Sequence, residues 1–156
     1  IKNGNEIKIL NIESRLVSDF PVNDIDVDTK IKGKVDRIDE YNGTLRIIDY
    51  KTGIVEPRDL EIGDWGDLTL DYKYSKVIQV LSYAFMANKT ASYENIEAGI
   101  ISFKRLKKGF IKFTQKGKPK QTNITQEILD KYTIELKKLI LEISNKEIPF
   151  KEKDVE

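Results

Sequence analysis

The 156-residue sequence contains neither cysteine nor histidine. The absence of cysteine excludes disulfides, thiolate-bound iron–sulfur clusters and cysteine nucleophiles. The absence of both residues excludes Cys/His zinc sites and every catalytic triad that requires histidine. Catalysis, if the chain performs any, must therefore rely on Asp, Glu, Lys, Ser, Thr or Tyr, with or without a metal ion that prefers oxygen ligands.

The sequence also lacks a signal peptide and any apolar run of about 18 residues, so no membrane contact is expected. It contains no glycine-rich phosphate loop of either common type, which argues against a carboxylate metal site that serves small-molecule chemistry. The missing cysteines fit a cytoplasmic location. The length predicts a single domain over residues 1–156, and the start at Ile1 predicts that this domain is part of a longer protein.

A strong charge of either sign is missing overall, since 27 Lys and Arg face 26 Asp and Glu. The distribution is nevertheless uneven, because eight bases and no acid lie between Glu97 and Glu127. This segment is either a phosphate-binding hairpin or a solvated edge hairpin whose lysines prevent aggregation. Its candidate nucleic-acid-binding residues are Lys104, Arg105, Lys107, Lys108, Lys112 and Lys116.

The hydrophobic pattern predicts an alternation of strands and helices that is typical of one mixed α/β domain. Strands are predicted over residues 6–18, 31–41, 44–51, 96–106 and 110–115. A first helix is predicted to run from a cap at or near Ser75 to Asn88. A second helix is predicted over residues 125–146, with one buried stripe formed by Leu129, Tyr132, Leu136, Ile140 and Ile143.

Residues 53–74 differ in kind from their surroundings. They contain Pro57, three glycines and six acids, and no helical or strand periodicity. This composition predicts a long acidic loop between the third strand and the first helix.

The dipeptide Asn42-Gly43 separates two β-branched runs and predicts a type I′ hairpin turn. Such a turn fixes the register and places Asp36 opposite Asp49 on one face. Two carboxylates directly opposite each other destabilise a sheet unless something neutralises them, and a divalent cation is the natural choice.

Two further pairs follow from the same register. On the other face of the hairpin, Asp39 lies opposite Arg46, and this complementary pair supports the register. On the face of the two aspartates, Lys34 lies opposite Lys51.

The predicted helix over residues 75–88 is apolar around most of its circumference, but Lys76, Gln79 and Tyr83 share one face. A helix of this kind is buried, so its polar stripe must meet polar groups inside the protein. One interpretation is a hydrogen-bonded Gln–Tyr pair between helix and sheet. The other is that the stripe faces the two carboxylates or their substrate.

Three short motifs carry a family resemblance. They are G-K-V-D-R-I-D over residues 33–39, I-I-D-Y-K-T-G over residues 47–53, and Q-x-x-x-Y over residues 79–83. In this order and spacing they resemble the PD-(D/E)xK nuclease superfamily, in its RecB/AddB-like branch. The resemblance implies an α/β, restriction-endonuclease-like core with a central mixed β-sheet flanked by helices.

The resemblance also implies a function: a metal-dependent nuclease that hydrolyses DNA phosphodiester bonds, as an exonuclease module in recombination or repair. It implies that the chain is the C-terminal part of a longer protein, with a helicase domain or subunit as partner. The alternative is a catalytically inactive, nuclease-derived module that binds DNA or serves as a scaffold.

Carried over to this sequence, the motifs imply a catalytic set. Asp36 and Asp49, with the Tyr50 carbonyl, would bind Mg²⁺ or Mn²⁺, and Lys51 would orient the attacking water or stabilise charge on the phosphate. The accessory motif implies that Gln79 and Tyr83 organise the site.

The sequence departs from the family pattern in two respects. Relatives often carry an upstream histidine as a further metal ligand, which this chain lacks. Either the segment that carries this histidine lies before Ile1, or another group substitutes for it. Within the chain the candidate is Glu13, which could equally be an ordinary glutamate of an edge strand. Some relatives also hold an iron–sulfur cluster through four cysteines, and the missing cysteines exclude such a cluster within this chain.

Overall fold

A computed structural model of the protein describes residues 4–26, 28–89 and 93–149, so the ends of the predicted domain lie outside the described residues. The predicted order of strands and helices is confirmed. The main elements are β1 (Ile7–Asp19), β2 (Lys30–Tyr41), β3 (Thr44–Lys51), β4 (Glu61–Ile62), α1 (Ser75–Asn88), β5 (Ile96–Ser102), β6 (Phe110–Lys112), β7 (Thr114–Gln115) and α2 (Gln126–Ser144).

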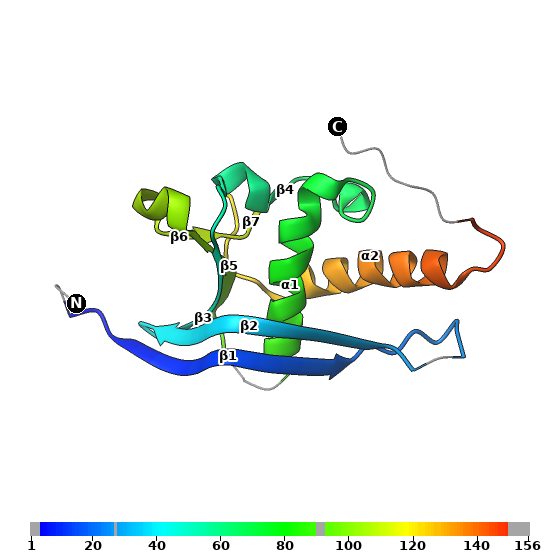
Figure 1. Ribbon diagram of the computed structural model, residues 1–156, viewed down its shortest axis with the longest axis horizontal. Helices are drawn as coiled ribbons and strands as arrows, with labels where there is room; N and C mark the ends of the chain where they lie inside the picture. The colour runs from blue at the N-terminus through cyan, green and yellow to red at the C-terminus, as the bar shows by residue number, and fades with distance from the viewer. Residues whose placement is uncertain (1–3, 27, 90–92, 150–156) are drawn as a thin grey trace.

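Five strands form one mixed sheet in the order β1-β2-β3-β5-β6. The β1, β2 and β3 strands are antiparallel, β3 and β5 are parallel, and β6 returns antiparallel to β5. The parallel pair requires a crossover, and α1 provides it by passing across the sheet (Figure 1). This is the mixed sheet with flanking helices that the family resemblance implies.

The β2–β3 hairpin has the predicted turn and register. Asn42 and Gly43 have φ angles of 49° and 80°, the two positive values that a type I′ turn requires. The ladder pairs Glu40 with Leu45 and Asp39 with Arg46, as predicted.

The ladder does not extend to the two aspartates. Its last pair is Arg37 with Ile48, and beyond it β2 continues alone beside β1. Val35 and Ile38 are three residues apart, yet both belong to the core, so side-chain alternation along β2 slips by one residue between them. The predicted direct pairs Asp36/Asp49 and Lys34/Lys51 are therefore absent, and β2 and β3 diverge at this point.

The sequence predicts a long loop for the acidic segment over residues 53–74, and this prediction is wrong. The segment folds into three short 3₁₀ turns, and β4 within it pairs in parallel with β7. Val55, Leu60 and Leu68 are fully buried in the core. Their burial fixes the backbone of the segment, while Asp64 and Asp67 are exposed and its other four acids are partly buried.

The predicted strand over residues 96–106 ends early. β5 stops at Ser102, and Phe103–Lys108 forms a 3₁₀ segment that ends at Gly109, whose φ is 63°. Four of the six predicted nucleic-acid-binding residues thus lie on a compact turn between β5 and β6, whereas Lys112 lies in β6 and Lys116 follows β7.

Both helices lie close to their predicted bounds. Ser75 is the first residue of α1, and its N-cap, Tyr74, makes no side-chain capping bond. Thr125 caps α2 by accepting a hydrogen bond from the backbone of Ile128. The stripe on α2 is buried only in its first half, because Ile143 is 55% exposed.

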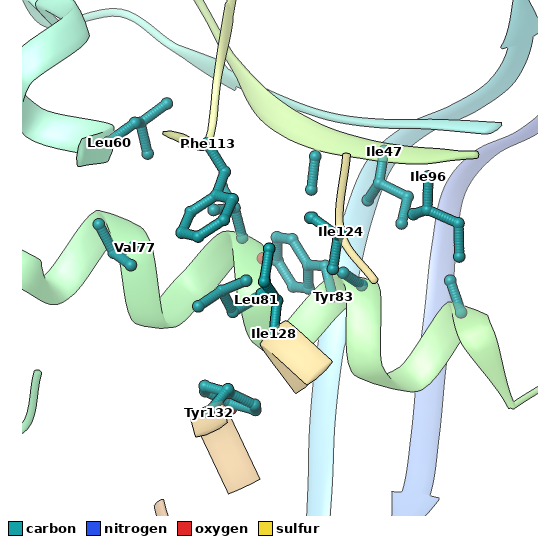
Figure 2. Packing of buried hydrophobic residues seen from close by; sticks show 14 of the residues in the cluster. Ile47, Leu60, Val77, Leu81, Tyr83, Ile96, Phe113, Ile124, Ile128 and Tyr132 are labelled. Carbon is teal, nitrogen blue, oxygen red and sulfur yellow. The ribbon is translucent and has the colours of Figure 1, made fainter. Parts of the chain in front are cut away.

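The core lies between the sheet and the two helices (Figure 2). Phe113 and Leu81 are fully buried there, and Tyr132 of α2 reaches α1, where its hydroxyl is 2.7 Å from Ser82 Oγ. Burial raises the pKa of Tyr132 to about 12. Among the described residues, no helix is long and apolar enough to cross a membrane.

Candidate active site

Asp49 is the most buried acid at the place where β2 and β3 diverge. It lies near the end of β3, with 5% of its surface exposed. Gln79 Nε2 donates a hydrogen bond of 3.2 Å to its Oδ1, and Lys51 Nζ lies 2.9 Å from its Oδ2. Lys51 is two residues further along the same strand, so the pleat places both side chains on one face.

The environment of Asp49 disfavours its negative charge. Burial raises the pKa of the Asp49 carboxyl, the ammonium group of Lys51 lowers it, and the charge of Asp36 raises it further. The net direction is upward. The Oδ2 atom is buried and makes no well-formed hydrogen bond. The Lys51 ammonium is the cation beside this oxygen in the structure, and a metal ion bound here would share the carboxylate with it or displace it.

Asp36 is held next to this site by the backbone of β3. The amide of Tyr50 donates a hydrogen bond of 2.8 Å to Asp36 Oδ2. The carboxylate thus takes the acceptor position that a main-chain carbonyl would occupy if the ladder continued. It is through this bond, and not through strand register, that Asp36 and Asp49 come together.

Gln79 and Tyr83 bring helix α1 to the same site. Gln79 Nε2 also donates to the Tyr83 hydroxyl, at 3.0 Å, and Tyr83 is only 8% exposed. The predicted Gln–Tyr hydrogen bond exists, but it lies within α1, and Gln79 in turn links the helix to the Asp49 carboxylate on the sheet. Lys76, the third residue of the predicted stripe, instead lies 3.9 Å from Asp59 in the acidic segment.

The close approach of α1 to β2 depends on Gly33, a motif residue for which the sequence suggested no role. A Cβ at this position would lie 2.7 Å from Tyr83 Cε1 and 3.0 Å from Met86 Cε. Because Tyr83 is buried, its ring has little room to yield. The glycine therefore allows the tyrosine to reach Gln79.

We expect Gly33→Ala to displace Tyr83 and release Gln79 from its position beside Asp49. Loss of such a supporting contact typically lowers activity by roughly 10–100-fold, and overpacking costs about 1–3 kcal/mol of stability. Metal-dependent DNA cleavage and thermal melting would measure the two effects. Gly63→Ala is the control, because its Cβ would make only an ordinary contact, at 3.6 Å. Wild-type values for Gly33→Ala would contradict the role of this glycine.

A second charged cluster lies on the other side of β2. Asp39 is completely buried and forms ion pairs with Arg37 and Arg46, the latter in a two-bonded arrangement at 2.7 and 3.0 Å. Arg37 also contacts the side chain of Tyr50. The D-R-x-D motif contains these residues, but the sequence predicted only the pair of Asp39 with Arg46.

The basic segment contacts the site through a pair of stacked aromatic rings. The rings of Tyr50 and Phe103 stack with centroids 5.6 Å apart, and Phe103 is 52% exposed. Three of the predicted nucleic-acid-binding residues form ion pairs with acids: Arg105 with Glu56, Lys112 with Glu97, and Lys116 with Glu61. Within the described part of the chain, the others, Lys104, Lys107 and Lys108, form no ion pair.

Glu13 does not join the two aspartates. Its carboxylate accepts a hydrogen bond of 2.7 Å from Lys34 Nζ, and both side chains are exposed. Among the described residues, no three acidic side chains gather as a metal site. A metal ion at Asp36 and Asp49 would therefore take its other ligands from the backbone, water or substrate.

Comparison with known proteins agrees with the motifs and the sheet. The family model of the PD-(D/E)XK nuclease superfamily matches residues 3–154, which is nearly the whole chain. No curated protein and no solved structure matches the sequence. The match extends well beyond the three motifs and covers every described strand and helix. The chain belongs to the PD-(D/E)XK nuclease superfamily.

Proposed function

We propose that this chain is a metal-dependent nuclease domain that hydrolyses DNA phosphodiester bonds at Asp36, Asp49 and Lys51. The observation that carries the proposal is the meeting of two carboxylates where β2 and β3 diverge, one of them buried beside a lysine. A structural ion pair would not need a second carboxylate next to the first, since like charges destabilise each other.

The donor set fits a divalent cation. Asp49 Oδ2 is buried beside the Lys51 ammonium, and carboxylate and carbonyl oxygens are preferred ligands of Mg²⁺ and Mn²⁺. Asp36, Asp49 and the carbonyl of Tyr50 would hold the ion. When bound, it supplies Lewis-acid chemistry that offsets negative charge on a phosphate and makes water more acidic.

The remaining residues act on the substrate and on one another. Lys51 Nζ, with its side chain 34% exposed, can turn from Asp49 toward a phosphate oxygen or the attacking water and offset the developing charge. Gln79 fixes the orientation of Asp49, and Tyr83 holds Gln79 in place. No step requires a covalent bond to the protein, which agrees with a chain that lacks cysteine and histidine.

The family resemblance supports the finer parts of the proposal. It favours an exonuclease module in recombination or repair, located in the cytoplasm and working with a helicase domain or subunit. The exposed lysines of the Phe103–Lys108 turn lie beside Tyr50 and would contact the phosphates of the DNA.

The proposal is tested with the purified wild-type chain. We expect Mn²⁺ or Mg²⁺ to support cleavage of end-labelled single- or double-stranded DNA, and EDTA to stop it. Metal at ten times its Kd should raise the melting temperature by about 3–6 °C, because it binds only the folded state. A chain that melts identically with and without metal and leaves both DNA forms intact would overturn the proposal. DNA binding that does not respond to changes at Asp36 and Asp49 would favour the scaffold alternative.

A further inference from the structure

The β1–β2 pair extends past the rest of the sheet. Its register runs in step from Ile12/Arg37 to Asp19/Lys30 except at Glu13, whose φ is 50° and which has no register partner, whereas β3 pairs with β2 only as far as Arg37. In Figure 1 the two strands cross beneath α1 and continue beyond it toward their connecting loop. We call the part of this pair spanning residues 13–19 and 30–36 the arm.

The two faces of the arm differ. Leu16 and Ile31 pack against the core, and Gly33 meets Tyr83, so this face is covered by α1. The opposite face carries the cross-strand pairs Arg15/Lys34, Val17/Lys32 and Asp19/Lys30. Because side chains two residues apart point the same way, Lys32 and Lys34 share this face, and Asp36 follows Lys34 two residues further along β2.

The outer face of the arm holds more positive charge than its own acids neutralise. Arg15 lies directly opposite Lys34, and two like charges in this position destabilise a strand pair. Lys34 is paired with Glu13, but within the described residues Arg15 and Lys32 have no acidic partner. Both side chains are exposed. An anion bound between Arg15, Lys32 and Lys34 would relieve the repulsion.

The surface at this point is hollowed and not flat. A concavity of about 390 Å³ is lined by Arg15, Leu16, Val17, Lys32, Gly33 and Lys34. Its lining combines apolar and cationic residues, which suits the sugar–phosphate backbone of a nucleic acid with its apolar sugar edges and regularly spaced charges.

We propose that the outer face of the arm is a track for the sugar–phosphate backbone of the DNA, which guides the strand toward Asp36. This inference rests on the proposed nuclease function and adds a second phosphate-binding surface to the Phe103–Lys108 turn. In this arrangement Glu13 competes with phosphate for Lys34.

The test measures binding separately from cleavage. Fluorescence anisotropy of labelled DNA in EDTA compares the wild-type chain with the double variant Arg15→Gln/Lys32→Gln. Losing two phosphate contacts should raise Kd at least about tenfold near 0.1 M salt. It should also reduce the salt slope, which is the slope of log Kd against log salt concentration, by roughly 1.4–1.8. Glu13→Gln, which frees Lys34, should lower Kd. A melting curve verifies that each variant is folded.

The control is Lys8→Gln/Lys146→Gln, which removes the same charge at exposed positions outside the arm. The proposed DNA track would be overturned if the arm variant and the control had the same salt slope. It would also be overturned if Glu13→Gln left Kd unchanged. If the wild-type chain cleaves DNA with Mn²⁺ in that case, the nuclease function still stands. A wild-type chain that neither binds nor cleaves DNA would overturn both proposals.

Discussion

Asp49→Asn is expected to lower metal-dependent DNA cleavage by about 10³-fold or more. The substitution keeps the shape of the side chain but removes the charge that would hold the metal, and metal-ion stabilisation is worth several kcal/mol at about 1.4 kcal/mol per tenfold change in rate. Cleavage of labelled DNA in saturating Mn²⁺ measures the loss. Asp67→Asn, the same change at an exposed acid in the acidic segment, should cleave like the wild type.

The same variant is expected to be more stable than the wild type in EDTA at neutral pH, by up to about 1 kcal/mol. Burial raises the pKa of Asp49 in the folded state, so the folded protein binds a proton there more tightly than the unfolded chain. This proton binding contributes to the stability of the folded state. The contribution is fully present below the ordinary Asp pKa of 3.8 and is lost as the pH rises through the higher pKa of Asp49 in the folded state.

The gain in stability of Asp49→Asn should therefore appear above the folded pKa and disappear in acid. Denaturant unfolding at several pH values, without metal, measures this difference. Lys51 loses its partner in the variant, but it is 34% exposed and can be hydrated, so its loss costs little. A variant that is less stable than the wild type at pH 7 and still cleaves DNA would show that Asp49 has a structural role only.

Gly99→Ala is expected to cause the largest loss of stability. A Cβ at Gly99 would lie 2.1 Å from the backbone oxygen of Ile111 and 2.9 Å from the ring of Phe110. Backbone in a paired strand cannot yield, so β5 and β6 must separate. We expect a cost of about 3 kcal/mol, or a fall in melting temperature of about 6–12 °C.

The matched control is Gly53→Ala, whose Cβ would meet nothing within 4 Å. It should change the melting temperature by no more than a few degrees, and an alanine that fits its backbone can even stabilise a protein. Equal melting temperatures for the two variants would show that β6 is not held closely against β5.

The local features of the fold could be predicted from the sequence because short segments determine them. The Asn42-Gly43 turn needs two positive φ angles, and this dipeptide supplies them. The slip in β2 could not be predicted, because it arises from a tertiary requirement: Val35 and Ile38 both pack into the core. Periodicity within one strand contains no information about such a requirement.

The backbone predictions for the acidic segment and the basic turn are wrong for related reasons. Leu60 and Leu68 are spaced among six acids, so no periodic pattern marks them as core residues. Around Phe103 the alternation of apolar and basic residues is typical of a strand, but the chain leaves the sheet after Ser102. The composition predicts the charge of each segment correctly, but the secondary structure predicted for each segment is wrong.

For the candidate site, the motifs predict which residues take part but not how they meet. The motifs placed Gln79 on a helix that faces the carboxylates, and the crossover between parallel strands positions that helix. The role of Gly33 depends on the distance between α1 and β2, which no sequence pattern reveals.

The divergence of β2 and β3 has a consequence for how firmly the two carboxylates are held. In a continuous ladder, repeated main-chain bonds on either side would fix their separation. Here the separation depends on the bond from the Tyr50 amide to Asp36, at the open end of the ladder. We therefore expect the Asp36 carboxylate to move without disturbing the paired strands, so that the two carboxylates adjust to cations of different radius.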